Sequence, residues 1–191
     1  PRKFKTLFSV LFKIAIRYIP KNIYRHFLHQ GVKPYSQEYG TDRGKEIARY
    51  YVECFLEQNP KLLEGNCLEF QAPTYLLKYA DPRKCKMNVI HLEDSNVLAN
   101  IVGDLTQTNT IPSNYFDCII CTHVLHVVYK KEKFLSEINR ILKPGGFLLL
   151  AVPGVSMCDY SWNELWRFTE LGIQQMLEQK FDKDCIQVKG Y

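Results

Sequence analysis

The stretch Tyr115-Phe116-Asp117-Cys118-Ile119-Ile120-Cys121-Thr122 decides the fold class of this chain. Apart from Asp117 it is almost wholly apolar, which is typical of a central strand buried on both faces of a parallel sheet. Helical spacing of apolar residues follows over 131–142, and Pro144-Gly145-Gly146 breaks that helix. A second apolar stretch over 147–152 predicts the next strand. The order strand, helix, strand is the repeating unit of a parallel sheet.

The same alternation extends toward both ends of the chain. Further strands are predicted over 66–70, 87–92 and 100–105, with helices over 45–58 and 165–180 and the start of a helix over 75–79. The predicted buried faces hold Ile47, Tyr50, Tyr51, Cys54 and Phe55 in the first helix, and Phe134, Leu135, Ile138, Ile141 and Leu142 in the helix at 131–142. The pattern predicts an α/β fold with a doubly wound, mostly parallel sheet flanked by helices. Ligands of such sheets bind beyond the carboxyl ends of the strands.

Composition favours one folded domain with a short appendage. The chain has 191 residues, of which 46% are hydrophobic and 24% charged, so disordered and collagen-like classes are excluded. Seven cysteines are too few and too unevenly placed for a disulfide framework, which favours a reducing, cytoplasmic location. Cys118 and Cys121 resemble a metal-binding pair, but residues three apart on a strand point to opposite faces. We therefore expect apolar thiols and no metal site.

Charge divides the chain into two predicted parts. Residues 1–37 contain eight Lys or Arg and no Asp or Glu, although the whole chain has a net charge of only +5. We therefore predict a basic amphipathic helical arm over 1–37 and a mildly acidic domain over 38–191. The arm's apolar residues recur at helical spacing from Phe4 to Ile19, before Pro20. Packing on the domain or on a partner subunit and peripheral contact with an anionic membrane are both open, whereas nucleic-acid binding is not expected.

Several motifs resemble those of the class I S-adenosylmethionine-dependent methyltransferases. They are Tyr115-Phe116-Asp117-Cys118-Ile119-Ile120-Cys121, Leu125-His126, and Ile138-Asn139-Arg140-Ile141-Leu142-Lys143-Pro144-Gly145-Gly146-Phe147-Leu148-Leu149. The resemblance covers about residue 40 to the C-terminus and implies a Rossmann-like sheet with S-adenosylmethionine as cofactor. Family members usually finish with an antiparallel hairpin, whereas residues 185–189 provide one strand at most, so we expect a truncated hairpin.

The resemblance also implies cofactor-binding residues. Val102-Gly103-Asp104-Leu105 matches the motif in which an acidic side chain contacts the adenine amino group, and Leu68-Glu69-Phe70 matches the end of the first strand. Either Glu93 or Asp94 would bind the ribose hydroxyls, with Asn88 as an alternative if the second strand ends early. The segment from Glu93 to Asn100 is short for a crossover helix. The cofactor-binding candidates are Glu69, Gln71, Glu93, Asp104, Leu105 and Thr122.

The first loop departs from the family pattern. The family has two glycines after its first-strand acid, but this chain reads Glu69-Phe70-Gln71-Ala72-Pro73-Thr74. Gln71 and Pro73 add side-chain bulk where bare backbone would approach the methionine part of the cofactor, and Pro73 lacks an amide hydrogen. This loop favours the alternative function, a non-catalytic domain of the same fold kept for binding or assembly.

His126 is the candidate catalytic base, because it follows the fourth strand and a neutral imidazole accepts a proton from a hydroxyl group. Its structural alternative is a histidine that packs under the next helix. Asp117 is expected to serve strand entry, and Trp166 and Phe168 are expected in the core. The block Trp166-Arg167-Phe168-Thr169, with Gly40-Thr41-Asp42-Arg43 upstream, resembles a bacterial subset associated with glycan or cell-surface synthesis. The resemblance thus implies O-methylation of a glycan-like or small-molecule hydroxyl acceptor; the oligomeric state stays open.

Overall fold

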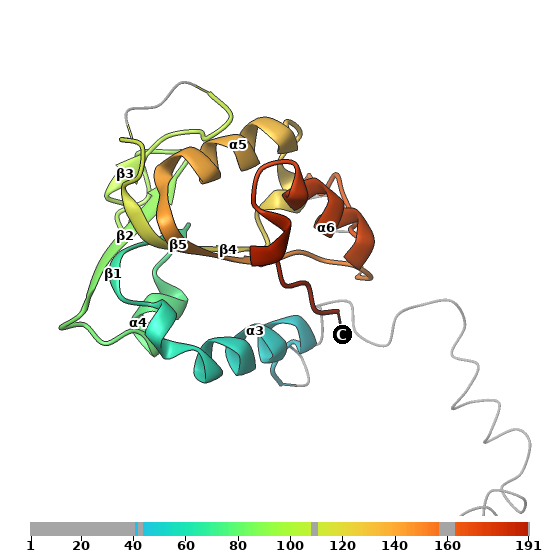
Figure 1. Ribbon diagram of the computed structural model, residues 1–191. Helices are drawn as coiled ribbons and strands as arrows, with labels where there is room; N and C mark the ends of the chain where they lie inside the picture. Colours follow the sequence, from blue (N-terminus) through green and yellow to red (C-terminus); the bar gives the residue numbers. More distant parts are fainter. Residues whose placement is uncertain (1–40, 42–43, 108–110, 157–162, 191) are drawn as a thin grey trace, which may run out of the picture. The chain divides into compact units, whose positions relative to one another are not determined.

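A parallel sheet of five strands lies at the centre of the computed structural model (Figure 1). The structure describes residues 41, 44–107, 111–156 and 163–190, and all of them except Thr41 belong to one compact unit that spans Arg43–Tyr191. The predicted arm over 1–37 lies outside the described residues. The strands are β1 (Gly65–Phe70), β2 (Cys85–His91), β3 (Ile101–Val102), β4 (Phe116–Thr122) and β5 (Leu142–Ala151).

The described residues also form four α-helices and three short 3-10 helices. The α-helices are α3 (Ile47–Gln58), α4 (Thr74–Tyr79), α5 (Lys131–Ile141) and α6 (Glu170–Glu178). The 3-10 helices are η2 (Pro60–Leu62), η3 (Leu125–Val127) and η5 (Lys183–Cys185). The connection from β2 to β3 contains no helix, as the short segment from Glu93 to Asn100 predicted. Within the described ranges, no helix combines the length and the hydropathy needed to span a bilayer.

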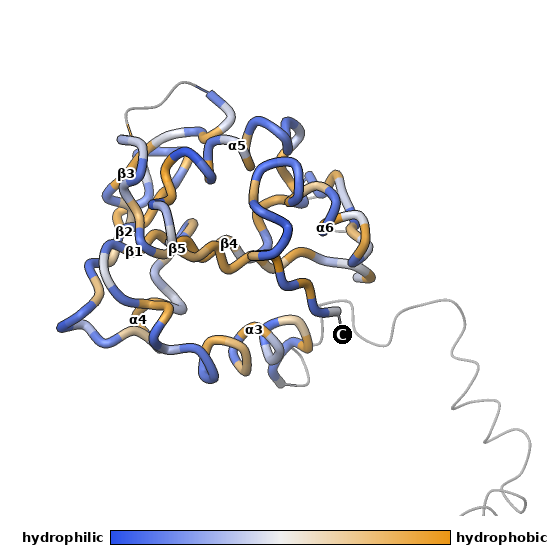
Figure 2. Tube along the Cα trace, viewed as in Figure 1, coloured by the Kyte–Doolittle hydropathy of each residue, from blue (hydrophilic) through white to orange (hydrophobic). Residues whose placement is uncertain are grey.

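The strand order is β3-β2-β1-β4-β5, and every pairing is parallel. Helices α3 and α4 cover one face of this sheet, and α5 and α6 lie on the other (Figure 1). The predicted doubly wound α/β fold is therefore confirmed. Figure 2 shows the same arrangement as apolar strands in the centre and hydrophilic segments in the outer turns.

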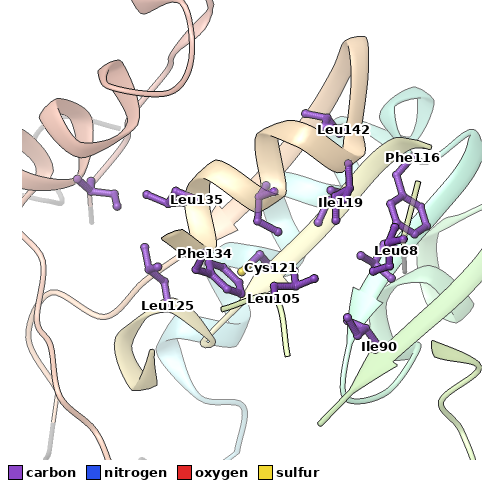
Figure 3. Close-up of a cluster of buried hydrophobic side chains, with 14 residues drawn as sticks. Leu68, Ile90, Leu105, Phe116, Ile119, Cys121, Leu125, Phe134, Leu135 and Leu142 are labelled. Carbon is purple, nitrogen blue, oxygen red and sulfur yellow. The ribbon is translucent and has the colours of Figure 1, made fainter. Parts of the chain in front are cut away.

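Each face of the sheet has its own hydrophobic core. Ile119 and Cys121 of β4 face the α5 side, where they pack with Leu68, Phe134 and Leu135 (Figure 3). Cys118 and Ile120 alternate with them and pack on the α3 side. The two cysteines of the Cys-x-x-Cys pattern thus lie on opposite faces, as strand geometry requires. In the described residues, no group of three or more His, Cys, Asp or Glu side chains is placed to hold a metal ion.

Asp117 connects β1, β4 and β5 at the amino-terminal end of the sheet. Its Oδ2 accepts the amide hydrogen of Asn66 at 2.8 Å and the ammonium of Lys143 at 2.7 Å, and these contacts lower the pKa of Asp117. Gly65 has φ +80, and a Cβ there would lie 2.6 Å from the carboxyl carbon of Asp117. Asp117 therefore has the predicted structural role at strand entry.

The helix predicted over 165–180 is wrong at its start. Helix α6 begins only at Glu170, because Thr169 caps it by accepting the amide hydrogen of Gly172 at 3.1 Å. Residues 165–168 have no regular secondary structure, and the amides of Leu165 and Trp166 donate to the carbonyl of His126. The strand predicted over 100–105 is also shorter, since only Ile101 and Val102 pair with β2.

Two other boundaries differ near Pro144-Gly145-Gly146. This segment does not separate α5 from the next strand, because β5 begins at Leu142 and the glycines lie in an irregularity of its pairing with β4. No strand follows β5 in residues 163–190, so β5 is an edge of the described sheet.

The predicted buried face of α3 is wrong. Ile47 and Tyr50 are exposed, and Val52 and Leu56 pack against the sheet instead. Apolar residues occur on several sides of this helix, so spacing alone did not select the face that packs.

Candidate active site at the carboxyl ends of the strands

The strand order reverses between β1 and β4, and this reversal locates the candidate site. From β1 the chain winds outward to β2 and β3, and then it returns to β4 and β5 on the other side. The loops after β1 and β4 therefore separate, and ligands of open α/β sheets bind in the crevice that results. Glu69 pairs with Ile120, and Thr122 is the last residue of β4, so the loops after β1 and β4 leave the sheet at the same edge.

Two strained residues flank this reversal. Gln71 has φ +69 and His123 has φ +52, so both adopt the left-handed conformation that side chains other than those of Gly, Asn and Asp rarely occupy. The other non-glycine residues with positive φ in the described residues are Asn114 and Asn163. Backbone strain of this kind concentrates at functional sites. In this protein, the loop after β1 and the loop after β4 each contain one residue with this left-handed backbone.

Glu69 is buried, with only 2% of its surface exposed. Its carboxylate accepts amide hydrogens from Tyr75 at 2.9 Å and from Leu76 at 2.9 Å, which satisfies the first turn of α4. Burial raises the pKa of Glu69 to about 7, against the opposing effect of these hydrogen bonds. Of the predicted cofactor ligands, Glu69 is thus already engaged by the protein, and it shapes the first loop.

The first loop is tied to the neighbouring connection. The amide of Gln71 donates to the carbonyl of Ile90 at 2.9 Å, and the side-chain amide of Asn96 donates to the carbonyl of Gln71 at 2.7 Å. Pro73 directly precedes α4 and contributes no amide hydrogen there. The left-handed backbone at Gln71 is consequently held from two sides, and the residue is exposed.

Acidic side chains follow β2 and β3 at the same edge. Glu93 is exposed, and its carboxylate accepts only the hydroxyl hydrogen of Ser95 at 3.1 Å among the hydrogen bonds of its side chain. Asp104 accepts the amide hydrogen of Thr106 at 2.7 Å through one oxygen, as a turn residue does. Leu105 is buried in the core with 3% exposed, so only its backbone is available to a ligand.

Asn88 does not lie at this edge. It is buried in the middle of β2, where its amide donates to the side-chain oxygen of Asn66 at 2.7 Å and to the carbonyl of Cys67 at 3.0 Å. Strand β2 continues to His91, so the condition under which Asn88 would bind a ribose is not met.

His126 lies in η3 after β4 and is 6% exposed. Its Nε2 is 3.3 Å from Oε1 of Glu164, and Oε2 of Glu164 accepts a hydrogen bond from Arg167 at 2.6 Å. Its other ring nitrogen, Nδ1, is buried and has no hydrogen-bond partner among the described residues. Burial lowers the pKa of His126 despite the nearby carboxylate. A neutral imidazole with one orphaned nitrogen is the arrangement expected of a proton acceptor waiting for a substrate.

Sequence reasoning missed Glu164 and Arg167 as parts of this site. They are 38 and 41 residues after His126, and no motif spacing joins them to it. The segment that precedes α6 brings them together, because its amides bind the carbonyl of His126.

The donor set at this edge fits the adenosine half of S-adenosylmethionine, the cofactor that the family resemblance implies. Carboxylates accept hydrogen bonds from ribose hydroxyls and from an adenine amino group, and Glu93 and Asp104 each retain carboxylate capacity after β2 and β3. In the first loop, which the family resemblance assigns to the methionine half of the cofactor, Gln71 has the left-handed backbone that suits glycine. Unlike glycine, it carries a side chain there.

Comparisons with known proteins agree with this geometry. Residues 56–150 match a family model described as a methyltransferase domain. A ubiquinone/menaquinone biosynthesis C-methyltransferase from Vibrio cholerae is 43% identical over 61 residues, which is 31% of this chain and 24% of that protein. The corresponding enzyme of Yersinia pestis is 41% identical over the same length. The chain thus spans about a quarter of the length of these curated relatives.

Solved structures with the same fold include two methyltransferases. One is the Burkholderia thailandensis 1,6-didemethyltoxoflavin-N1-methyltransferase with bound S-adenosylhomocysteine, at a TM-score of 0.55 and 14% identity, covering 74% of this chain and 72% of the other. Another is an S-adenosylmethionine-dependent methyltransferase from Archaeoglobus fulgidus, at a TM-score of 0.54 and 13% identity, covering 73% and 70%. Residues 56–150, just under half of the chain, thus match a methyltransferase domain, and the described residues share the fold of these solved structures.

Proposed function

We propose that this protein transfers a methyl group from S-adenosylmethionine to a hydroxyl group of a small-molecule or glycan-like acceptor, with His126 as the base. The observation that supports it best is the buried, unpartnered Nδ1 of His126, next to the point where the strand order reverses. The acceptor class rests on this base, because a hydroxyl must lose its proton as its oxygen takes the methyl group. Its glycan-like form rests on the resemblance of residues 166–169 alone.

Glu164 sets the protonation of the imidazole. A carboxylate 3.3 Å from Nε2 favours the tautomer in which Nε2 carries the hydrogen, and this leaves the lone pair on Nδ1. In this proposal the acceptor displaces the groups that bury Nδ1, His126 accepts the hydroxyl proton there, and Glu164 stabilises the resulting imidazolium, as the carboxylate of a catalytic triad does. Arg167 holds the carboxylate of Glu164 in place. The cofactor supplies the electrophilic methyl group, and its sulfur keeps the electron pair of the bond that breaks.

Glu93 would hold the ribose hydroxyls and Asp104 the adenine amino group. The left-handed backbone of Gln71 supports a site derived from a glycine loop, because glycine adopts that conformation without strain. In this proposal the Gln71 side chain replaces bare backbone at the edge of the cofactor. The same replacement supports the alternative of a non-catalytic domain.

A second candidate is methylation of carbon instead of oxygen. It is supported by the 61-residue similarity to enzymes named as C-methyltransferases. An acidic ring carbon also loses a proton to a base, so His126 would serve either acceptor. The two differ in the product, since only O-methylation gives a methyl ether.

Calorimetric titration with S-adenosylhomocysteine tests the cofactor site first. We expect saturable binding, lost in Asp104→Ala and weakened in Asp104→Asn, which keeps a side-chain oxygen for the amide of Thr106. Asp184→Asn, at an exposed position after α6, removes the same charge and should bind normally. Absence of binding to a folded chain would refute methyl transfer and support the binding or assembly domain.

Activity on a panel of phenols, sugars and quinols then tests the base. His126→Gln should lower kcat by about 100-fold or more, the usual contribution of a general base. Glu164→Gln should lower it less, and the pH at which the rate is half-maximal should fall, because the carboxylate no longer favours imidazolium. Unchanged rates in His126→Gln, with S-adenosylhomocysteine still bound, would remove His126 from the mechanism.

A further inference from the structure

A shallow hollow of about 470 Å³ lies at the start of α5. It is lined by Tyr129, Lys130, Lys131, Glu132, Lys133 and Trp166. Three lysines thus face one carboxylate in this hollow, although the domain without its arm is slightly acidic. One residue that lines the hollow is hydrogen-bonded to the candidate base, because the amide of Trp166 donates to the carbonyl of His126 at 3.0 Å.

Lys131 is the unusual residue of this hollow. Lysine is rarely buried unless its ammonium is paired, yet Lys131 is only 8% exposed. Its Nζ lies 3.1 Å from the centre of the Trp166 ring, and no carboxylate is within ion-pair distance of it among the described residues. A cation held on a ring face retains its hydrogen-bond donors for another group.

The start of α5 adds a second attraction for anions. The residue before the helix, Lys130, provides no side-chain cap for the first amides, and Glu132 is the acidic residue of the first turn. Helix amino-termini bind phosphate and carboxylate groups through their amide hydrogens. Lys131 is the first residue of the helix, and its ammonium and the helix end are therefore close together.

Aromatic rings form the wall of the hollow. The Tyr129 ring is 6.5 Å from the Trp166 ring at an angle of 30°, and Tyr129 is 74% exposed. Trp166 is fixed in position because its indole N–H donates to the carbonyl of Val128 at 2.9 Å. Trp166 was expected in the core but lies outside it, whereas Phe168 packs against the core as expected. Fixed aromatic faces favour flat, ring-shaped ligands.

We propose that this hollow binds the methyl acceptor through its anionic group, and that the acceptor is a small molecule with both a ring and a phosphate or carboxylate. The inference rests on the proposed function, which it extends by naming a substrate class. Lys131 and the α5 end bind the anion, and Tyr129 contacts the ring.

Titration of the purified chain with phenyl phosphate, inorganic phosphate and phenol tests this assignment without methyl transfer. Phenyl phosphate should bind more tightly than either of the others. Lys131→Met keeps the aliphatic stem over Trp166 but removes the charge, and it should weaken phenyl phosphate by about 10-fold or more, as loss of a charge-assisted hydrogen bond does. Tyr129→Ser should weaken phenyl phosphate and leave inorganic phosphate unchanged. Lys86→Met, at an exposed position of β2, is the matched control.

Three results would overturn the assignment. They are absence of phenyl phosphate binding, equal binding of inorganic and phenyl phosphate, and an equal loss in Lys86→Met. S-adenosylhomocysteine titrated into the same variants separates the two proposals, because Lys131→Met should bind it normally. Loss of phenyl phosphate binding with intact S-adenosylhomocysteine binding removes only the hollow's role. The reverse pattern removes the proposed methyl transfer and leaves an anion site.

Discussion

Replacing Glu69 with glutamine should make the stability of this protein less dependent on pH. Burial raises the pKa of Glu69 from 4.5 to about 7, so the folded chain holds this proton more tightly than the unfolded chain does. Its stabilising contribution is therefore complete below about pH 4.5 and is lost as the pH rises through about 7. Because one pKa unit corresponds to about 1.4 kcal/mol, the loss amounts to about 3 kcal/mol.

Urea unfolding followed by circular dichroism at about pH 5 and about pH 8 measures this effect. The wild-type free energy of unfolding should fall by about 2 to 3 kcal/mol more than that of Glu69→Gln between these conditions. Glutamine keeps an oxygen for the amides of Tyr75 and Leu76, so the cap of α4 survives. Glu178→Gln, an exposed glutamate, should follow the wild type. If the free energy of unfolding changed equally with pH in wild type and in Glu69→Gln, the raised pKa of Glu69 would be refuted.

Three further predictions follow from the described contacts. Gly65→Ala should lower the free energy of unfolding by about 2 kcal/mol, because Gly65 has φ +80 and the new Cβ would clash with Asp117. As a control in the same urea experiment, Gly103→Ala should change this free energy by less than about 1 kcal/mol, because no atom lies near the new Cβ. Gln71→Gly should tighten S-adenosylhomocysteine binding in calorimetry without lowering the melting temperature; weaker binding would contradict a glycine-derived loop. Glu53→Gln should destabilise the chain at neutral pH by about 1 to 2 kcal/mol, because two half-exposed lysines lower the pKa of Glu53 to about 2. The difference in stability between wild type and Glu53→Gln should vanish as the pH falls through about 2.

The fold class and much of the core were readable from the sequence wherever the pattern was long and apolar. Strand β4 begins and ends where the residues from Phe116 to Thr122 predict, and the buried face of α5 matches its apolar spacing. In both cases local preference and burial favour the same structure, because a strand buried on both faces and a helix with one apolar stripe have no competing arrangement. The parallel, doubly wound fold follows from these elements and their order.

Local pattern failed where tertiary contacts outweighed it. Residues 165–168 have helical spacing, yet they form no helix, because two of their amides bind the carbonyl of His126. The apolar face of α3 was misassigned because its apolar residues surround the helix, and only the sheet decides which of them packs.

The sequence by itself determined the strands, the helix between them and the loops where a ligand must bind, since these depend on composition and spacing along the chain. Only the tertiary structure decided what the residues of those loops contact. It engaged Glu69 in capping α4, placed Glu164 beside His126, and seated Lys131 on Trp166. These contacts join residues 6, 38 and 35 positions apart, and the spacing of loop residues over such distances carries no periodic signal. Chain direction and burial, which the packed sheet imposes, are the physical reason that they meet.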